Sequence, residues 1–181
     1  MTAKTHQTAV VLTPPEECWG PIQAIRARHD RQYRRWMPHV TLLYPFRPRE
    51  QFDAVEGRLR EACRSIPPFQ VQLAEFRHFR HGRARSTLWL APEPEEALVR
   101  LQTALESAVP DCNDVSRHAA GFTPHLSVGQ VQTSQAPAGL QANLQAGWQP
   151  LTFAARTVSL IWRGRPPEDV FQVDRRLPLG Q

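Results

Sequence analysis

The sequence predicts an α+β protein built from two similar halves that face each other across a groove. A five-residue pattern of Pro, His, an apolar residue, a hydroxyl residue and a second apolar residue occurs twice, at Pro38–Leu42 and at Pro124–Val128. The apolar periodicity also repeats, so each half is expected to run strand, helix, motif strand, helix, strand. Two such halves could place their motif strands side by side, with the helices outside.

The chain length is that of one domain. With 181 residues, 41% of them hydrophobic, the chain can bury a sizeable core without disulfides or metal ions. We therefore expect a single domain over residues 1–181, with one lobe at about 8–80 and the other at about 86–177. We expect this domain to be a monomer.

Apolar patterns and proline breaks define the elements of the first half. The strand at 8–13 is a short apolar run closed by Pro14-Pro15, and the helix at 52–66 has apolar residues at steps of three and four. The basic segment 77–85 is expected to be a loop. The expected elements are a strand at 8–13, a helix over 16–32, the motif strand 37–44, a helix over 52–66 and a strand over 69–76.

The second half repeats this order. Its clearest helix has one apolar face between Ala97 and Ala108 and ends at Pro110. The other expected elements are a strand at 86–91, the motif strand 122–131, a weaker helix over 139–146, a strand at 157–162 and a last strand at 170–173.

Cysteine usage and the lack of long apolar runs indicate a cytoplasmic protein that does not enter the membrane. Cys18, Cys63 and Cys112 are odd in number and widely separated, which argues against a disulfide framework or a zinc ribbon. No run approaches the roughly 20 apolar residues of a membrane span. The segment Met1 to Val11 lacks the features of a leader, so we expect an unprocessed chain.

Basic residues are almost all arginines. The formal net charge is +5, and of the 22 basic residues only Lys4 is a lysine. Guanidinium groups bind phosphate through paired hydrogen bonds and stack on bases, so an RNA or nucleotide partner is a reasonable expectation. A genome that favours arginine codons would explain the same composition.

The duplicated motif carries the chemistry. Alternate side chains of a strand share one face, so His39 and Thr41 are expected on one face of their strand, above a core that contains Val40. His125 and Ser127 repeat the arrangement. A single strand histidine is more often structural than catalytic, but two matched pairs of imidazole and hydroxyl predict one acid–base site. Each preceding proline lacks an N–H group and marks the start of its strand.

At these residues the chain resembles the 2H phosphoesterase superfamily, whose members share two H-x-[ST]-x motifs and include the 2′-5′ RNA ligase-like proteins. His39–Leu42 and His125–Val128 both match, and the flanking segments 43–46 and 122–124 resemble the 2′-5′ RNA ligase-like branch. The resemblance implies a bilobal α+β fold of two pseudo-symmetric lobes, each with an antiparallel sheet and outer helices, around a central groove. Some members carry an Arg shortly after the second motif, where this chain has Gly129-Gln130.

The implied activity is a metal-independent phosphodiesterase that acts on 2′,3′-cyclic phosphate ends of RNA or on related cyclic or 2′-5′-linked nucleotides. His39 and His125 would act jointly as base and acid, since an imidazole with a pKa of about 6.5 can be neutral or charged near neutrality. Thr41 and Ser127 would donate hydrogen bonds to phosphate oxygens. No cofactor or metal ion is implied. Hydrolysis and the reverse 2′-5′ ligation both remain open, as does the physiological substrate.

Four further residues are candidate substrate contacts. Tyr44 and Phe46 could stack on a base, although closing the strand against a helix is the more common role for such residues. Trp162 and Arg163 end a strand that could border the groove, although a core position explains the Trp as well. The pair His78 and His81 lacks a third ligand at a useful spacing, so we expect no metal there.

Two other classes of function are consistent with parts of the sequence. A non-catalytic module that binds nucleotides or RNA ends would keep the groove without turnover, but it would have no need for two histidines. A scaffold that uses its arginine-rich faces would not depend on the motifs at all.

Overall fold

The computed structural model describes residues 3–82, 85–117, 121–132 and 137–180. Along the chain lie β1 (Thr8–Leu12), α1 (Trp19–His29), β2 (Val40–Leu43), α2 (Phe52–Arg64), β3 (Phe69–His81), β4 (Arg85–Glu93), α3 (Glu95–Ala108), β5 (Leu126–Gln132), α4 (Pro137–Gly147), β6 (Leu151–Ala155), β7 (Thr157–Trp162) and β8 (Gln172–Pro178). The expected order of strand, helix, motif strand, helix, strand is present up to β3. In the second half an unexpected strand, β6, precedes the expected strand at 157–162, which is β7, and the last strand, β8, begins and ends later than the expected 170–173.

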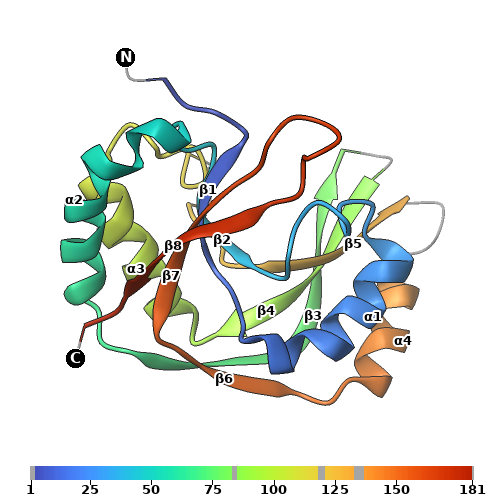
Figure 1. Cartoon of the computed structure of the whole chain (residues 1–181). Helices are drawn as coiled ribbons and strands as arrows, with labels where there is room; N and C mark the ends of the chain where they lie inside the picture. Colours follow the sequence, from blue (N-terminus) through green and yellow to red (C-terminus); the bar gives the residue numbers. More distant parts are fainter. Residues whose placement is uncertain (1–2, 83–84, 118–120, 133–136, 181) are drawn as a thin grey trace.

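Two four-stranded antiparallel sheets form the centre of the molecule (Figure 1). Their strand orders are β2-β1-β7-β8 and β5-β4-β3-β6. In each sheet the motif strand lies at one edge and pairs with the first strand of its own half, β1 or β4. The edge strands β2 and β5 contact each other. The predicted α+β class with two antiparallel sheets is confirmed, and the topology places both motifs at the junction of the sheets.

The two sheets do not follow the expected division of the chain near residues 80–86. β3 belongs to the second sheet because it forms a long hairpin with β4, paired from Gln72–Glu93 to His81–Arg85. The first sheet is completed instead by β7 and β8 from the end of the chain. The prediction that 77–85 is a loop is therefore wrong over most of its length, since β3 extends to His81 and β4 begins at Arg85.

Helices cover the outer faces of both sheets. The buried residues of α2 are Phe52, Val55, Leu59 and Cys63, which confirms the helical stripe predicted from the sequence. α2 packs against α3 and β8, whereas α1 packs against β5 and α4 packs against β3. Figure 1 shows α2 and α3 on one side of the molecule and α1 and α4 on the other. The first-half helix α1 thus supports the motif strand of the second half.

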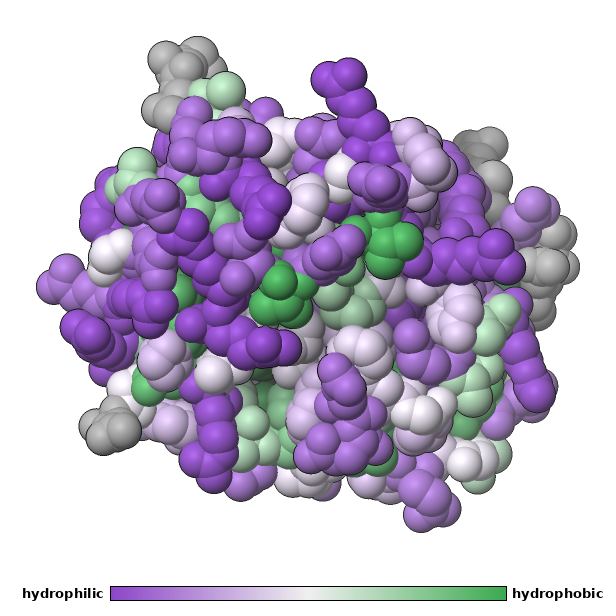
Figure 2. Space-filling model, viewed as in Figure 1, coloured by the Kyte–Doolittle hydropathy of each residue, from purple (hydrophilic) through white to green (hydrophobic). Residues whose placement is uncertain are grey.

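The surface is mainly hydrophilic. Figure 2 shows hydrophobic residues only as separate spots among hydrophilic ones on the face in view. Among the described residues the large hydrophobic side chain with notable exposure is Val170, at 48%. None of the helices in the described ranges is long and apolar enough to cross a bilayer.

Candidate active site

Each motif histidine immediately precedes its strand. β2 begins at Val40, directly after His39, and β5 begins at Leu126, directly after His125. The preceding residues Pro38 and Pro124 are buried and cannot donate a backbone hydrogen bond to a sheet, so the strands start after them. Both imidazoles therefore lie at the open ends of edge strands.

Residues of both motifs meet at one cavity of about 570 Å³. Thr41 of β2 lines it together with His125 and Ser127. His39 is not among the lining residues, but it lies two residues before Thr41, and a positive charge on His125 is close enough to lower the pKa of His39. The two predicted pairs of imidazole and hydroxyl are thus brought together. Further lining residues are Phe79, Arg80, His81, Thr87, Val115, Gly121, Phe122, Thr123 and Gln130.

The hydrogen bonds of both imidazoles specify the same tautomer. Nδ1 of His39 lies 2.6 Å from the carbonyl oxygen of Met37, and Nδ1 of His125 lies 2.9 Å from that of Thr123. A carbonyl oxygen only accepts, so each Nδ1 carries the proton and donates it. In the neutral ring, Nε2 is then left with a free lone pair. Each histidine is oriented by a carbonyl two residues earlier and can accept a proton at Nε2.

Aromatic rings surround the two imidazoles differently. Trp36 stacks on His39, with ring centroids 4.6 Å apart and planes at 17°. His125 instead meets the edges of Phe79 at 5.1 Å and Trp89 at 5.9 Å. Both environments remove water from the ring, which penalises the charged imidazolium.

Burial lowers the pKa of both histidines. For His39 it is the largest cause, and the pKa falls to about 4 although the Met37 carbonyl favours the charged ring. The pKa of His125 is also lowered, first by burial and, more weakly, by the charge of His81. Both rings are therefore expected to be neutral in the free protein at neutral pH.

A buried ion pair lies behind His39. Arg26 Nε donates to Asp30 Oδ2 at 2.8 Å, and the two side chains are only 2% and 3% exposed. The charge of Arg26 lowers the pKa of His39, and that of Asp30 raises it. Asp30 Oδ1 also accepts from Gln130 Nε2 at 3.1 Å. The spacing of four residues was available in the sequence, but nothing there indicated that this pair would be buried.

The contact between α1 and β5 depends on a glycine. A Cβ atom on Gly129 would lie 2.7 Å from His29 Cβ and 3.1 Å from the His29 carbonyl oxygen. Next to it, Gln130 Oε1 accepts from the backbone N–H of Arg31 at 3.1 Å. The Gly129-Gln130 pair that departs from the family pattern thus attaches the second motif strand to the end of α1.

The β3–β4 hairpin contributes residues to the cavity wall. Arg80 and His81 both line it, although the sequence predicted an exposed loop for their segment. His81 Nε2 lies 2.9 Å from Thr87 Oγ1 on the paired strand. By strand alternation Phe79 and His81 face the cavity, whereas the Arg80 side chain shares the face of His78, on the helix side of the sheet.

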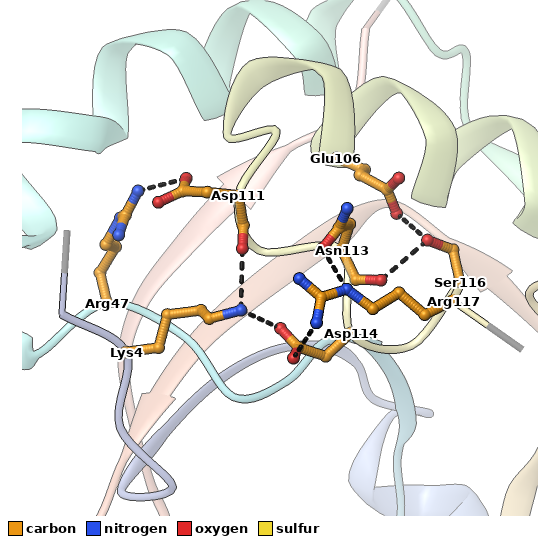
Figure 3. Close-up of polar contacts among 8 residues, drawn as sticks. All are labelled: Lys4, Arg47, Glu106, Asp111, Asn113, Asp114, Ser116 and Arg117. Carbon is orange, nitrogen blue, oxygen red and sulfur yellow. Dashed lines mark hydrogen bonds and ion pairs between the residues drawn. The ribbon is translucent and has the colours of Figure 1, made fainter. Parts of the chain in front are cut away.

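A network of polar side chains holds the connection between α3 and β5 (Figure 3). Val115 of this connection lines the cavity. Lys4 contacts the carboxylate of Asp114 and donates to the carbonyl oxygen of Asp111 at 2.8 Å. The buried Arg47 contacts the carboxylate of Asp111, which lowers the pKa of that carboxyl. The segment before β1 and the segment after β2 thus anchor this wall.

None of the four secondary candidates is among the residues that line the motif cavity. Phe46 is 0% exposed and packs against Phe52 of α2 with ring centroids 5.9 Å apart, so it closes the strand against a helix, as the alternative expectation had it, and cannot stack on a substrate base. Tyr44 is half-buried against Trp36, with centroids 5.5 Å apart. Trp162 and Arg163 line a separate cavity of about 380 Å³ that none of the motif residues lines.

His78 and His81 do not face a common ligand. His78 Nδ1 lies 2.7 Å from Gln141 Oε1 of α4, on the helix side of the sheet, whereas His81 lines the cavity. Within the described ranges, the side chains of His, Cys, Asp and Glu nowhere form a group of three suited to a metal ion.

Comparisons with known proteins agree with the motif. The family model of the 2′-5′ RNA ligase superfamily matches residues 14–167. A Halalkalibacterium halodurans protein named "Putative phosphoesterase" is 30% identical over 122 residues, which cover 67% of this chain and 68% of the relative. A Geobacillus kaustophilus protein with the same description is 28% identical over 122 residues, covering 67% of each chain.

Solved structures show the same fold. E. coli LigT complexed with 3′-AMP has a TM-score of 0.66 at 17% identity and covers 99% of this chain and 100% of its own. TT0787 of Thermus thermophilus has a TM-score of 0.66 at 21% identity, covering 97% of this chain and 99% of its own. With the family model spanning both motifs, the chain belongs to the 2′-5′ RNA ligase superfamily, a branch of the 2H phosphoesterases.

Proposed function

We propose that this phosphoesterase is a metal-independent phosphodiesterase that opens 2′,3′-cyclic phosphate ends of RNA, or closely related cyclic or 2′-5′-linked nucleotides. The observation that carries the proposal is the pair of histidines, each with Nδ1–H bonded to a carbonyl and Nε2 free, beside one cavity that both motif hydroxyls line. The 3′-AMP complex of the similarly folded LigT supports a nucleotide ligand.

The reaction needs one proton acceptor and one proton donor. One Nε2 removes a proton from water as the water oxygen bonds to phosphorus, and the other imidazolium gives its proton to the departing ribose oxygen. When the bond from phosphorus to O3′ breaks, the product is a 2′-phosphate with a free 3′-hydroxyl. A 5′-hydroxyl in place of water would give a 2′-5′ linkage. His39 and His125 share the two roles.

The surrounding groups stabilise charge at phosphorus. Thr41 and Ser127 line the cavity from the two motif strands and can donate to non-bridging oxygens. Binding of an anionic phosphodiester also favours the imidazolium form of a nearby histidine, so substrate itself would help to charge the acid, whose pKa is low in the free protein.

The test is turnover by single histidine variants in the presence of a chelator. His39→Ala and His125→Ala should each lower kcat for a 2′,3′-cyclic nucleotide by about 10²- to 10⁴-fold, since each removes one of the two proton-transfer groups. His78→Gln is the matched control, because its ring contacts α4 on the other side of the sheet. Product analysis should find the 2′-phosphate.

The alternative is a module that binds nucleotide ends without turnover. It predicts measurable affinity for the cyclic nucleotide and no product from the wild-type protein. Turnover that survives both alanine variants, with the circular dichroism of the folded protein unchanged, would also contradict the proposal.

A further inference from the structure

A second cavity, of about 380 Å³, lies outside the candidate active site. It is formed where the start of β1, the connection between β2 and α2, and the end of β7 meet. We call it the arginine pocket, because Arg49, Arg163 and Arg165 line it together with Trp162. One carboxylate, that of Glu50, lies among its lining residues. An anion is therefore the ligand class that this lining favours.

The backbone holds two of the arginines in place. The N–H of Arg163 donates to the Gln7 carbonyl oxygen at 2.8 Å, which continues the pairing of β1 and β7. The N–H of Gly164 donates to the Glu168 carbonyl oxygen at 3.0 Å, and the N–H of Glu168 donates back to the Arg165 carbonyl oxygen at 2.8 Å. A Cβ atom on Gly164 would lie 2.8 Å from that Glu168 oxygen, so the tight turn requires glycine. The loop is thus fixed before any ligand binds.

The guanidinium groups differ in how far they are already neutralised. Arg49 lies over the ring of Trp162 at 3.9 Å and donates to Asp174 Oδ1 at 2.7 Å. In the described part of the chain, Arg163 and Arg165 have no ion pair. The Arg163 side chain donates only to a carbonyl oxygen, that of Gly164, at 3.4 Å. Its buried Nε has no partner among the described residues. Two cations are therefore free to bind phosphate oxygens.

Aromatic side chains in contact with one another, among them the buried Phe171, connect this pocket with His39. Arg163 lies over the ring of Phe171 at 5.5 Å, and its charge acts on Tyr44, opposing the rise in pKa that burial causes there. Phe171 and Tyr44 both contact Trp36, at centroid distances of 3.8 and 5.5 Å. Trp36 in turn stacks on His39. The β7–β8 connection and the β3–β4 hairpin also project at the same end of the molecule (Figure 1).

We propose that the arginine pocket binds a backbone phosphate of the RNA strand whose cyclic end lies between His39 and His125. The strand would leave the active site past Trp36 and Tyr44 and reach the free guanidinium groups of the pocket. The inference rests on the proposed function and narrows it, because the preferred substrate becomes an oligoribonucleotide end and not a cyclic mononucleotide.

The first experiment compares two substrates in the double variant Arg163→Gln/Arg165→Gln. The variant should show a decrease of about tenfold or more in kcat/KM for a short oligoribonucleotide with a 2′,3′-cyclic phosphate end, mainly through KM. Its kcat/KM for a 2′,3′-cyclic mononucleotide should stay within twofold of the wild type. The control Arg58→Gln/Arg100→Gln removes the same charge from exposed positions on α2 and α3 and should not affect either substrate. Equal decreases for both substrates, or none, would overturn the inference.

The second experiment measures binding without turnover, which separates this inference from the proposed function. In a His39→Ala/His125→Ala background, fluorescence anisotropy gives the Kd of a labelled oligoribonucleotide with a 3′-phosphate. The two arginine changes should weaken binding and reduce the slope of log Kd against log salt by about 0.7 for each phosphate that the protein no longer binds. Unchanged affinity and slope would refute the pocket even if the enzyme is active. The inference would also be refuted if the two arginine changes weakened the binding of a free nucleoside monophosphate but not that of the oligoribonucleotide.

Discussion

The two motif strands share a plan but not an environment. β2 and β5 are both edge strands that follow a Pro-His pair, and in both the histidine donates Nδ1–H to a carbonyl two residues earlier. His39 is covered by a stacked Trp36 and lies near a buried ion pair, whereas His125 touches ring edges and faces the charge of His81. The duplicated motif therefore provides two similar imidazoles whose neighbours make them chemically different.

The difference extends along the strands. The fourth residue after the histidine is the buried Leu43 in β2 and Gly129 in β5, and the fifth is Tyr44 or Gln130. β5 needs the smaller residue because α1 crosses it closely there. α1, from the first half, thereby packs against β5 of the second half. The small residue at Gly129 therefore helps to keep the two motifs together. The variants below test this difference between the strands, from the largest expected effect to the smallest.

Asp30→Asn should be the most damaging change outside the motifs. It leaves Arg26 charged, buried and without its partner, which typically costs about 3–5 kcal/mol of folding free energy. Urea unfolding followed by circular dichroism measures the decrease in stability. Glu75→Gln is the control, because its pair with Arg77 is exposed and should contribute about 1 kcal/mol or less. Similar destabilisation in both variants would mean that the Arg26–Asp30 pair is not what holds α1 in place.

The contrast between these pairs also shows what the sequence could and could not predict. Local patterns sufficed for α2 and for β7 at Thr157–Trp162, because periodicity reports which face of an element is buried. The motif strands were predicted at 37–44 and 122–131, but they begin only at Val40 and Leu126, after the histidines. Strand partners depend on the whole chain, so the placement of β7 and β8 beside β1, and the short β6, were not predicted. The charges of 77–85 suggested a loop, although Phe79 stacks on Trp89 within the hairpin, with centroids 4.6 Å apart.

The site shows the same limit. Thr41, His125 and Ser127 line one cavity, and His39 lies near enough to His125 for the charge of that ring to lower its pKa. Nothing in the sequence indicated the long-range contacts that modify them, such as the burial of the pair on α1 or the position of His81 in the cavity wall near His125. The residues proposed to contact the substrate could be predicted from a sequence pattern. The residues that position them could be identified only once the fold was known.

Removal of the motif hydroxyls tests whether the two halves contribute equally to stabilising the negative charge of the substrate phosphate. Thr41→Val and Ser127→Ala should each lower kcat by roughly 10- to 1000-fold, because each removes a donor to the phosphate oxygens. Thr152→Val is the control, as an exposed strand threonine on β6 far from the motifs. Steady-state kinetics on a 2′,3′-cyclic nucleotide provides the measurement. If one variant keeps full activity, the phosphate is held from one strand only.

Gly129→Ala tests the contact that distinguishes β5 from β2. A Cβ at 2.7 Å from His29 Cβ must push α1 away, and such overpacking costs about 1–3 kcal/mol. Activity should fall as well, since Gln130 and the second motif move with the strand. The control Gly57→Ala lies in α2 with open space around it and should instead stabilise the protein, by up to about 1 kcal/mol. Opposite signs for the two variants in thermal unfolding are the expected result, and equal signs would contradict the close packing of α1 on β5.

The smallest effect concerns the charge near the second histidine. NMR titration of the imidazole nitrogens should find His39 protonated only near pH 4, and the pKa of His125 below its ordinary value of 6.5. A site that needs one neutral and one charged imidazole then works best on the acid side of pH 6.5, since above it both rings of the free enzyme are neutral. His81→Gln removes a positive charge that disfavours protonated His125, so the pKa of His125 should rise slightly towards its ordinary value. The pKa of His39 should not change, because His81 is not among the charges that act on it. Equal shifts of both histidines would mean that the two imidazoles titrate as one coupled pair, and that the asymmetry of their surroundings does not separate their roles.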